Sequence, residues 1–80
     1  MRDICNTRTV ELILKTCANE ATIIRLFYTA GVSYYSLKKY LFYLIEDHLI
    51  SYQAVDGVYV LTYEGWKLLL MIDRVEQMVN

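Results

Sequence analysis

The sequence predicts an α+β domain, mostly α, in which three helices precede a β-hairpin and a long C-terminal helix. Apolar residues recur with helical spacing up to about residue 48, alternate with a period of two from 49 to 62, and return to helical spacing from 63 onward. The 80 residues, of which 56% are hydrophobic and 21% charged, suffice for a single globular domain. A core this small is marginal, so a partner subunit would add stability.

The first helix is predicted over residues 6–18. Its apolar face consists of Val10, Ile13, Leu14, Cys17 and Ala18. Arg8, Glu11 and Lys15 fall on other faces. We expect Asn19 to end the helix, because asparagine tolerates the left-handed conformation that terminates many helices.

The second helix is predicted to begin near Glu20, whose charge suits the positive end of the helix dipole, and to close at Gly31. Its expected buried stripe consists of Ile23, Leu26, Phe27 and Ala30. The short link over residues 31–33 leads directly into the next helix. The second and third helices therefore form a helix-turn-helix, with the short turn that this motif requires.

The third helix, predicted over about residues 34–47, has two contrasting faces. Ser33 is its expected N-cap, since a serine hydroxyl can accept a hydrogen bond from a free amide of the first turn. The expected core stripe is Leu37, Leu41, Leu44, Ile45 and His48. At about 100° per residue, the residues opposite this stripe are Tyr35, Lys39 and Tyr43, flanked by Ser36, Lys38 and Phe42. Aromatic rings, a hydroxyl group and two cations on one face favour a DNA-recognition helix.

The period changes to two after the third helix. Residues 49–54 and 58–62 are strand-like and rich in Ile, Tyr and Val, and Asp56 and Gly57 between them indicate a tight hairpin. A hairpin directly behind a helix-turn-helix is a wing, so the predicted fold is a winged helix-turn-helix. Its candidate DNA contacts are Tyr52, Gln53 and Tyr59.

The last helix, capped by Thr62, carries two apolar stripes. The first consists of Trp66, Leu69 and Leu70, and the second, about 160° away, of Leu68, Met71, Ile72, Val75, Met78 and Val79. One stripe can dock on the winged domain, and the other would stay exposed unless it met a copy of itself. The sequence leaves open which stripe faces the partner, and we assign the second to the interface of a two-fold homodimer. The predicted organisation is a winged helix-turn-helix domain over residues 1–62 and a dimerisation helix over 63–80, in a single folding unit.

Other classes of function lack a pattern in this chain. No apolar run approaches the roughly 18 residues of a membrane span, and no signal-like block follows the first charges, so we expect a cytoplasmic protein without membrane contact. Cys5, Cys17 and the single histidine have no zinc-ligand spacing. On one helix the two cysteines would lie about 18 Å apart, too far for an internal disulfide. No nucleophile pattern or Gly-rich phosphate loop is present, so we expect no catalysis, metal, cofactor or small-molecule ligand.

Several short motifs occur in a specific order. They are residues 22–24 and 28–30 in the second helix, Leu37, Tyr40, Leu41 and Leu44 in the third, Leu49 and Ile50 after it, and residues 61–65 at the start of the last. Together they resemble archaeal winged helix-turn-helix DNA-binding proteins, in particular the small dimeric ones whose C-terminal helices pair as an antiparallel coiled coil. The resemblance covers about residue 10 to the end of the chain. It implies binding of double-stranded DNA, in transcriptional control or genome organisation, with the third helix in the major groove and the wing near the backbone.

The chain departs from that family at two places. His48 stands where the family often has glycine, so we expect this histidine to adopt the left-handed conformation. The wing has no Lys or Arg between residues 49 and 63. The cations left for DNA phosphates are Lys38 and Lys39, joined by Arg2, Arg8 and Arg25, while Tyr35, Ser36 and Tyr43 can bond phosphates or base edges.

The main alternative is a winged-helix module that binds protein and has little DNA affinity. The net charge is −1 and the wing carries no cation. Exposed rings such as Tyr35, Phe42 and Tyr43 are also typical of a protein-binding surface, because tyrosine is enriched at interfaces.

Overall fold

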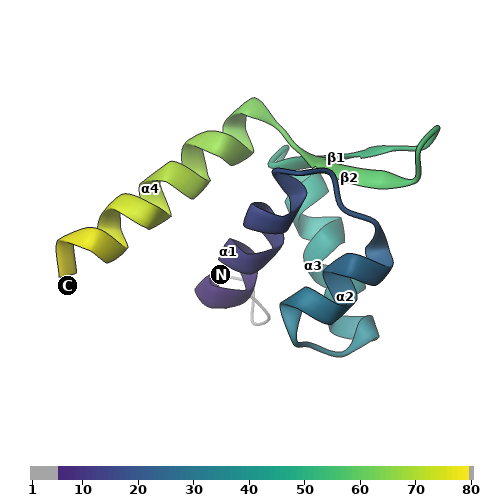
Figure 1. Ribbon diagram of the computed structural model, residues 1–80, viewed down its shortest axis with the longest axis horizontal. Coiled ribbons are helices and arrows are strands. Elements are labelled where there is room, and N and C mark those ends of the chain that lie inside the picture. The colour runs from purple at the N-terminus through teal and green to yellow at the C-terminus, as the bar shows by residue number, and fades with distance from the viewer. Residues whose placement is uncertain (1–5, 80) are drawn as a thin grey trace.

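The computed structural model describes residues 6–79 of the chain (Figure 1). The elements follow the predicted order and are α1 (Thr7–Cys17), α2 (Ile23–Ala30), α3 (Tyr34–Glu46), β1 (Ile50–Gln53), β2 (Val58–Leu61) and α4 (Tyr63–Val79). The first three helices form one group, from which the hairpin and α4 project in different directions (Figure 1). Arg2, Cys5 and the side chain of Val79 lie outside the described residues.

Each helix begins at a polar side chain that accepts a hydrogen bond from the amide three residues later. The predicted caps are confirmed at Ser33, whose Oγ accepts from the Ser36 amide at 3.1 Å, and at Thr62, whose Oγ1 accepts from the Gly65 amide at 3.0 Å. Asn6 and Thr22 cap α1 and α2 in the same way, each at 3.2 Å. These bonds satisfy amides that have no carbonyl partner within the helix and so fix where each helix starts.

The link between α1 and α2 differs from the prediction. Asn19 does not end α1 in the left-handed conformation. Instead, α1 is followed by Ala18 with φ −61°, and Glu20 is left-handed with φ 56°. Ala21 then pairs with Tyr59 of β2, with N···O distances of 3.0 and 2.7 Å. This long-range pairing holds residue 21 in an extended conformation, so α2 begins at Ile23 rather than near Glu20.

The end of α3 confirms the prediction for His48. Its φ is 61°, and its amide donates to the Ile45 carbonyl at 3.0 Å, while the Leu49 amide donates to the Leu44 carbonyl at 2.9 Å. These two bonds form a Schellman motif, which satisfies the last carbonyls of the helix. The chain is thereby turned from α3 directly into β1.

The hairpin is antiparallel, and its register pairs Ile50 with Leu61 and Tyr52 with Tyr59. Residues 54–57 form the turn, in which Gly57 has φ 67° and donates its amide to the Gln53 carbonyl at 2.8 Å. Both strands are shorter than predicted. The tip of the hairpin points away from the helices (Figure 1), and Val55 within it is fully exposed.

The core lies between the three helices and the base of the hairpin. Its buried apolar residues are Val10, Ile13, Leu14, Cys17, Ala21, Leu26, Ala30, Leu37, Tyr40, Leu41, Leu44, Ile50 and Leu69. Burial raises the pKa of the Cys17 thiol to about 12, so this cysteine acts as a small apolar core residue.

Three residues assigned to the core by helical spacing lie at the surface instead. Phe27 and Ile45 are 37% and 39% exposed, and His48 is also exposed. Tyr40, which the spacing did not assign to the core stripe, is buried instead, and its hydroxyl accepts a hydrogen bond from the Asn6 amide at 3.1 Å. That bond gives the polar end of a large buried ring a partner.

The prediction for Glu11 is also wrong. Helical spacing placed it away from the apolar face of α1, but it is only 2% exposed. Its Oε2 pairs with the Lys15 ammonium at 3.1 Å. The other carboxylate oxygen of Glu11, Oε1, is buried and accepts no hydrogen bond within the described part of the chain. A protonated Glu76, on α4, would donate a hydrogen bond to Glu11, which raises the pKa of Glu76, whereas the Lys15 ammonium is the main cause that lowers the pKa of Glu11.

Helix α4 docks along a line between its two predicted stripes. Leu69 is buried, Leu68 and Ile72 pack against the core cluster, and Gly65 approaches the backbone of Leu49 so closely that a Cβ there would clash with the Leu49 carbonyl. Each predicted stripe is therefore split. The members left exposed are Trp66 and Leu70 from the first stripe and Met71, Val75 and Met78 from the second.

Candidate nucleic-acid interface

The exposed side of α3 is fixed by the residues buried beneath it. Leu37, Leu41 and Leu44 are at most 5% exposed, so the rotation of the helix about its own axis is set by the core. The residues turned away from the core are Tyr34, Tyr35, Ser36, Lys38, Lys39, Phe42 and Tyr43, which we call the α3 outer face. Within it Tyr35 is 70% and Phe42 58% exposed, whereas Ser36 and Tyr43 are half-buried.

Both lysines of the α3 outer face lie against tyrosine rings one helical turn earlier. The Lys39 ammonium is 4.6 Å from the centroid of the Tyr35 ring, and the Lys38 ammonium is 5.7 Å from that of Tyr34. A hydrogen bond with Tyr35 is the main cause that raises the pKa of Lys39. Within residues 6–79 neither lysine forms an ion pair with an acid. Both charges are therefore available to an anionic ligand.

The three predicted DNA contacts in the wing differ in their exposure to solvent. Tyr52 is 50% exposed and Gln53 is also exposed, with its amide donating to the Ser51 hydroxyl at 3.5 Å. Tyr59 is half-buried against the core, its ring centroid lies 4.8 Å from that of Tyr52, and burial is the main cause that raises its pKa. Tyr59 is thus much less accessible than Tyr52. At the tip, Val55 is 98% exposed.

The structure therefore gathers the predicted DNA-binding residues into two places. Five of them share the α3 outer face, namely Tyr35, Ser36, Lys38, Lys39 and Tyr43, and three lie in the wing, namely Tyr52, Gln53 and Tyr59. The helix group contains both cations, and the wing group contains none.

Spacing alone did not reveal an aromatic cluster that joins α2 to α3. Phe27, Tyr28 and Tyr34, which we call the aromatic patch, are linked by ring-centroid distances of 5.6 Å between Phe27 and Tyr28 and 6.1 Å between Phe27 and Tyr34. Tyr28 is 80% and Tyr34 50% exposed. The sequence signal for this cluster is the run of rings on either side of the turn at residues 29–33, which a search for buried stripes passes over.

Most of the aromatic residues lie at the surface. The chain has 11 of them, from 8 tyrosines, 2 phenylalanines and 1 tryptophan, and Tyr40 is the one member of this set in the buried core. Aromatic rings usually supply core packing in small domains. Rings left exposed and clustered on a surface that also carries cations indicate a binding face.

Other kinds of site receive no support from the described side chains. Among residues 6–79, no three His, Cys, Asp or Glu side chains gather closely enough to hold a metal ion. No helix in the same part of the chain combines the length and apolar character needed to cross a bilayer.

The domain has three helices, of which α2 and α3 are joined by a short turn, and a hairpin follows them. This arrangement defines a winged helix-turn-helix domain. A comparison with family models agrees: the model described as winged helix-turn-helix matches residues 8–80, and the chain belongs to this family. No curated protein matches the chain. The family is one of DNA-binding domains, so DNA is the partner that membership supports.

Proposed function

We propose that this protein is a homodimeric double-stranded DNA-binding protein that regulates transcription, with α3 in the major groove and the wing near the DNA backbone. The observation that carries the proposal is the α3 outer face, where two lysines with no acidic partner among residues 6–79 stand on a helix whose rotation is fixed by buried leucines. An exposed helix of this kind in a winged helix-turn-helix domain has the dimensions that the major groove accepts.

The side chains have distinct proposed roles. Lys38 and Lys39 contact phosphates, and Tyr35, Ser36 and Tyr43 offer hydroxyl groups to phosphates or base edges. Tyr52, Gln53 and Tyr59 are the proposed wing contacts, with Tyr59 mainly supporting the ring of Tyr52. The wing contributes no positive charge, and its one charged residue is Asp56, so the proposed affinity depends on few cations.

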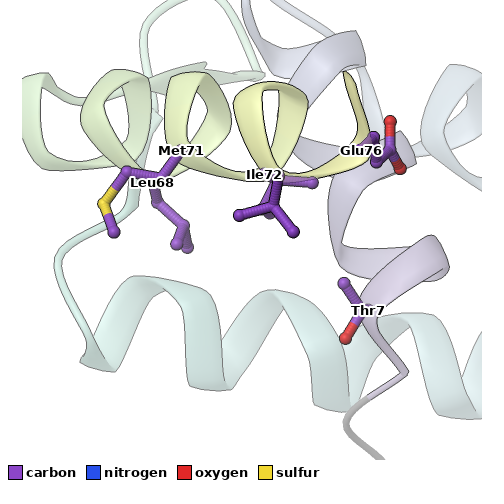
Figure 2. Close-up of a pocket in the computed structure, with 6 residues that line it drawn as sticks. Thr7, Leu68, Met71, Ile72 and Glu76 are labelled. Carbon is purple, nitrogen blue, oxygen red and sulfur yellow. The ribbon is translucent and has the colours of Figure 1, made fainter. Parts of the chain in front are cut away.

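The proposed dimer interface is on α4. Met71, Val75 and Met78 are 63%, 57% and 77% exposed, a large apolar area for so small a chain. Met71 and Val75 line an open groove of about 270 Å³ between α4 and α1 (Figure 2). Its other lining residues are Thr7 of α1 and Leu68, Ile72 and Glu76 of α4. We propose that α4 of a second copy covers this groove in an antiparallel arrangement, with Val79 extending the interface. Residues 1–62 and 63–80 then act as DNA-binding domain and dimerisation helix within a single folding unit.

The test is a titration of labelled duplex DNA by fluorescence anisotropy at several salt concentrations. Each phosphate contact contributes about 0.9 to the slope of log K against log salt, so two lysines in each subunit predict a shallow slope. Replacing both, Lys38→Ala with Lys39→Ala, should weaken binding about tenfold or more and reduce the slope by up to about 4 per dimer.

The matched control is Lys67→Ala. Lys67 is also exposed and lies against a tyrosine ring, 5.5 Å from the centroid of Tyr63, but it is on α4. This variant should bind DNA as the unaltered protein does. Equal affinity of the double variant and the unaltered protein would remove α3 from its proposed role.

A protein-binding module is the second candidate, favoured by a wing that has no cation and an exposed tip at Val55. Pull-down from lysate before and after nuclease treatment separates the two candidates. Partners retained after nuclease treatment, together with no affinity for duplex DNA, would favour the protein-binding module.

A further inference from the structure

The surface around α3 offers more aromatic rings than cations. Tyr28, Tyr34, Tyr35 and Phe42 are 80%, 50%, 70% and 58% exposed, and the α3 outer face has only the two lysines. In a B-form duplex the bases are stacked on one another and present only their edges in the grooves. Rings gain most from the flat faces of bases, and only unpaired bases offer these faces.

Two of these rings each lie near an ammonium group, as a base lies near a phosphate in a nucleotide. The Lys39 ammonium is 4.6 Å from the Tyr35 ring centroid, and the Lys38 ammonium is 5.7 Å from that of Tyr34. Each pair therefore offers a ring for a base and, within reach of it, a positive charge for the adjoining phosphate. The aromatic patch continues from Tyr34 through Phe27 to Tyr28, which extends the rings beyond α3 onto α2.

The low positive charge also favours stacking as the main source of affinity. Duplex binding relies on neutralising many phosphates, and its strength falls steeply with salt. Stacking of bases on aromatic side chains contributes regardless of net charge and tolerates any base sequence. A face with four exposed rings and two lysines is better suited to the second kind of binding.

We propose that the α3 outer face and the aromatic patch bind unpaired bases, so that the protein prefers single-stranded or locally opened DNA to a fully paired duplex. The inference rests on the proposed function, because it assigns the form of DNA that the same face binds. The rings needed for it are already at the surface, so no rearrangement of the core is required.

The experiment compares three labelled DNAs by fluorescence anisotropy: a short duplex, the same duplex with a central run of mismatched thymines, and one of its single strands. The opened duplex and the single strand should bind at least fivefold more tightly than the paired duplex. Their affinities should also fall less with added salt, since fewer counterions are released from single strands.

Variants at Tyr35 separate stacking from hydrogen bonding. Tyr35→Leu keeps an apolar side chain but removes the ring, and it should reduce binding to the opened duplex about fivefold or more. Tyr35→Phe keeps the ring and should retain the preference. The matched control is Tyr63→Leu, because Tyr63 is 76% exposed and has Lys67 at 5.5 Å from its ring centroid, but it lies on α4. Circular dichroism checks that all variants fold.

The outcomes distinguish this inference from the proposed function. A preference for opened DNA that is lost in Tyr35→Leu and kept in Tyr35→Phe supports the inference. Equal affinity for the three DNAs, or tighter binding to the paired duplex, overturns it while leaving duplex binding intact. Absence of binding to any of the three DNAs overturns both.

Discussion

Single residues decide how the charges of this small domain are distributed. Glu11 is buried on α1 beside Lys15, and Glu76 of α4 is its neighbour, so two carboxyl groups meet near the cations Lys15 and Arg8 where α4 docks. The pKa of Glu11 is lowered, so its contribution to stability is present above the ordinary value of 4.5 and is lost as the pH falls through its folded value. The pKa of Glu76 is raised above 4.5, so its contribution is present below that value and is lost as the pH rises through its folded value.

The raised pKa of Glu76 predicts the effect of Glu76→Gln on stability. A glutamine stays neutral and can donate a hydrogen bond to the Glu11 carboxylate at every pH, as a protonated Glu76 does only in acid. The variant should therefore have a higher thermal midpoint than the unaltered protein at neutral pH, and the difference should shrink as the pH falls toward 4.5. Thermal unfolding followed by circular dichroism over this range measures it.

The control for that prediction is Glu64→Gln, which removes an acid from the first turn of α4 that faces Lys67 at 3.8 Å and not another carboxyl group. It should show no gain at neutral pH, because the charge it removes is favourable at a helix N-terminus. A gain for Glu76→Gln that is as large in acid as at neutral pH would contradict the hydrogen bond from a protonated Glu76 to Glu11.

At the scale of the elements, caps and close approaches determine where helices start and how they dock. The hydroxyl of Thr62 both accepts from the Gly65 amide at 3.0 Å and donates to the His48 carbonyl at 2.6 Å. One side chain thus ties the start of α4 to the end of α3. Gly65, in the next turn, lies directly against the backbone of Leu49.

We predict that Gly65→Ala destabilises the protein, although alanine in a helix is favoured over glycine by about 1 kcal/mol. The added methyl group would overlap the Leu49 carbonyl, which belongs to the backbone and cannot move aside as a side chain can. Overpacking of this kind costs about 1 to 3 kcal/mol, and the free energy of unfolding in urea measures it.

Gln77→Ala is the corresponding control, since Gln77 is exposed on the same helix. Its free energy of unfolding should stay within about 0.5 kcal/mol of that of the unaltered protein. If Gly65→Ala were as stable as this control, α4 would not be held as closely to Leu49 as the structure indicates.

At the scale of the whole molecule, apolar side chains cover much of the outside. The principal extents are 39 × 25 × 23 Å, and α4 runs along one side and leaves its outer apolar residues uncovered (Figure 1). A domain with so small a core gains stability when such a surface is buried against a second copy.

The proposed dimer is tested by solution mass. The chain has a mass of 9.4 kDa, so sedimentation equilibrium should give about twice this value for the unaltered protein. Met71→Lys together with Val75→Lys should return the mass to that of one chain, because like charges would face each other across the two-fold axis. Leu70→Lys, at a site that is 62% exposed and does not line the groove, should stay dimeric. A single-chain mass for the unaltered protein would contradict the proposed dimer.

The sequence by itself determined the features that depend on neighbours along the chain. The element order, the caps at Ser33 and Thr62, and the left-handed His48 all follow from local hydrogen bonding and backbone sterics. The relation of Tyr35 and Lys39 to the buried leucines also follows, because the helical repeat fixes which residues share a face.

The tertiary structure alone decided which faces are covered and by what. The pairing of Ala21 with Tyr59, the burial of Glu11 beside α4, the exposure of Phe27 and the docking line through Leu69 each depend on a segment distant in sequence. Periodicity shows which side chains lie together, but burial is a property of two surfaces in contact. The second surface becomes known only when the chain has folded.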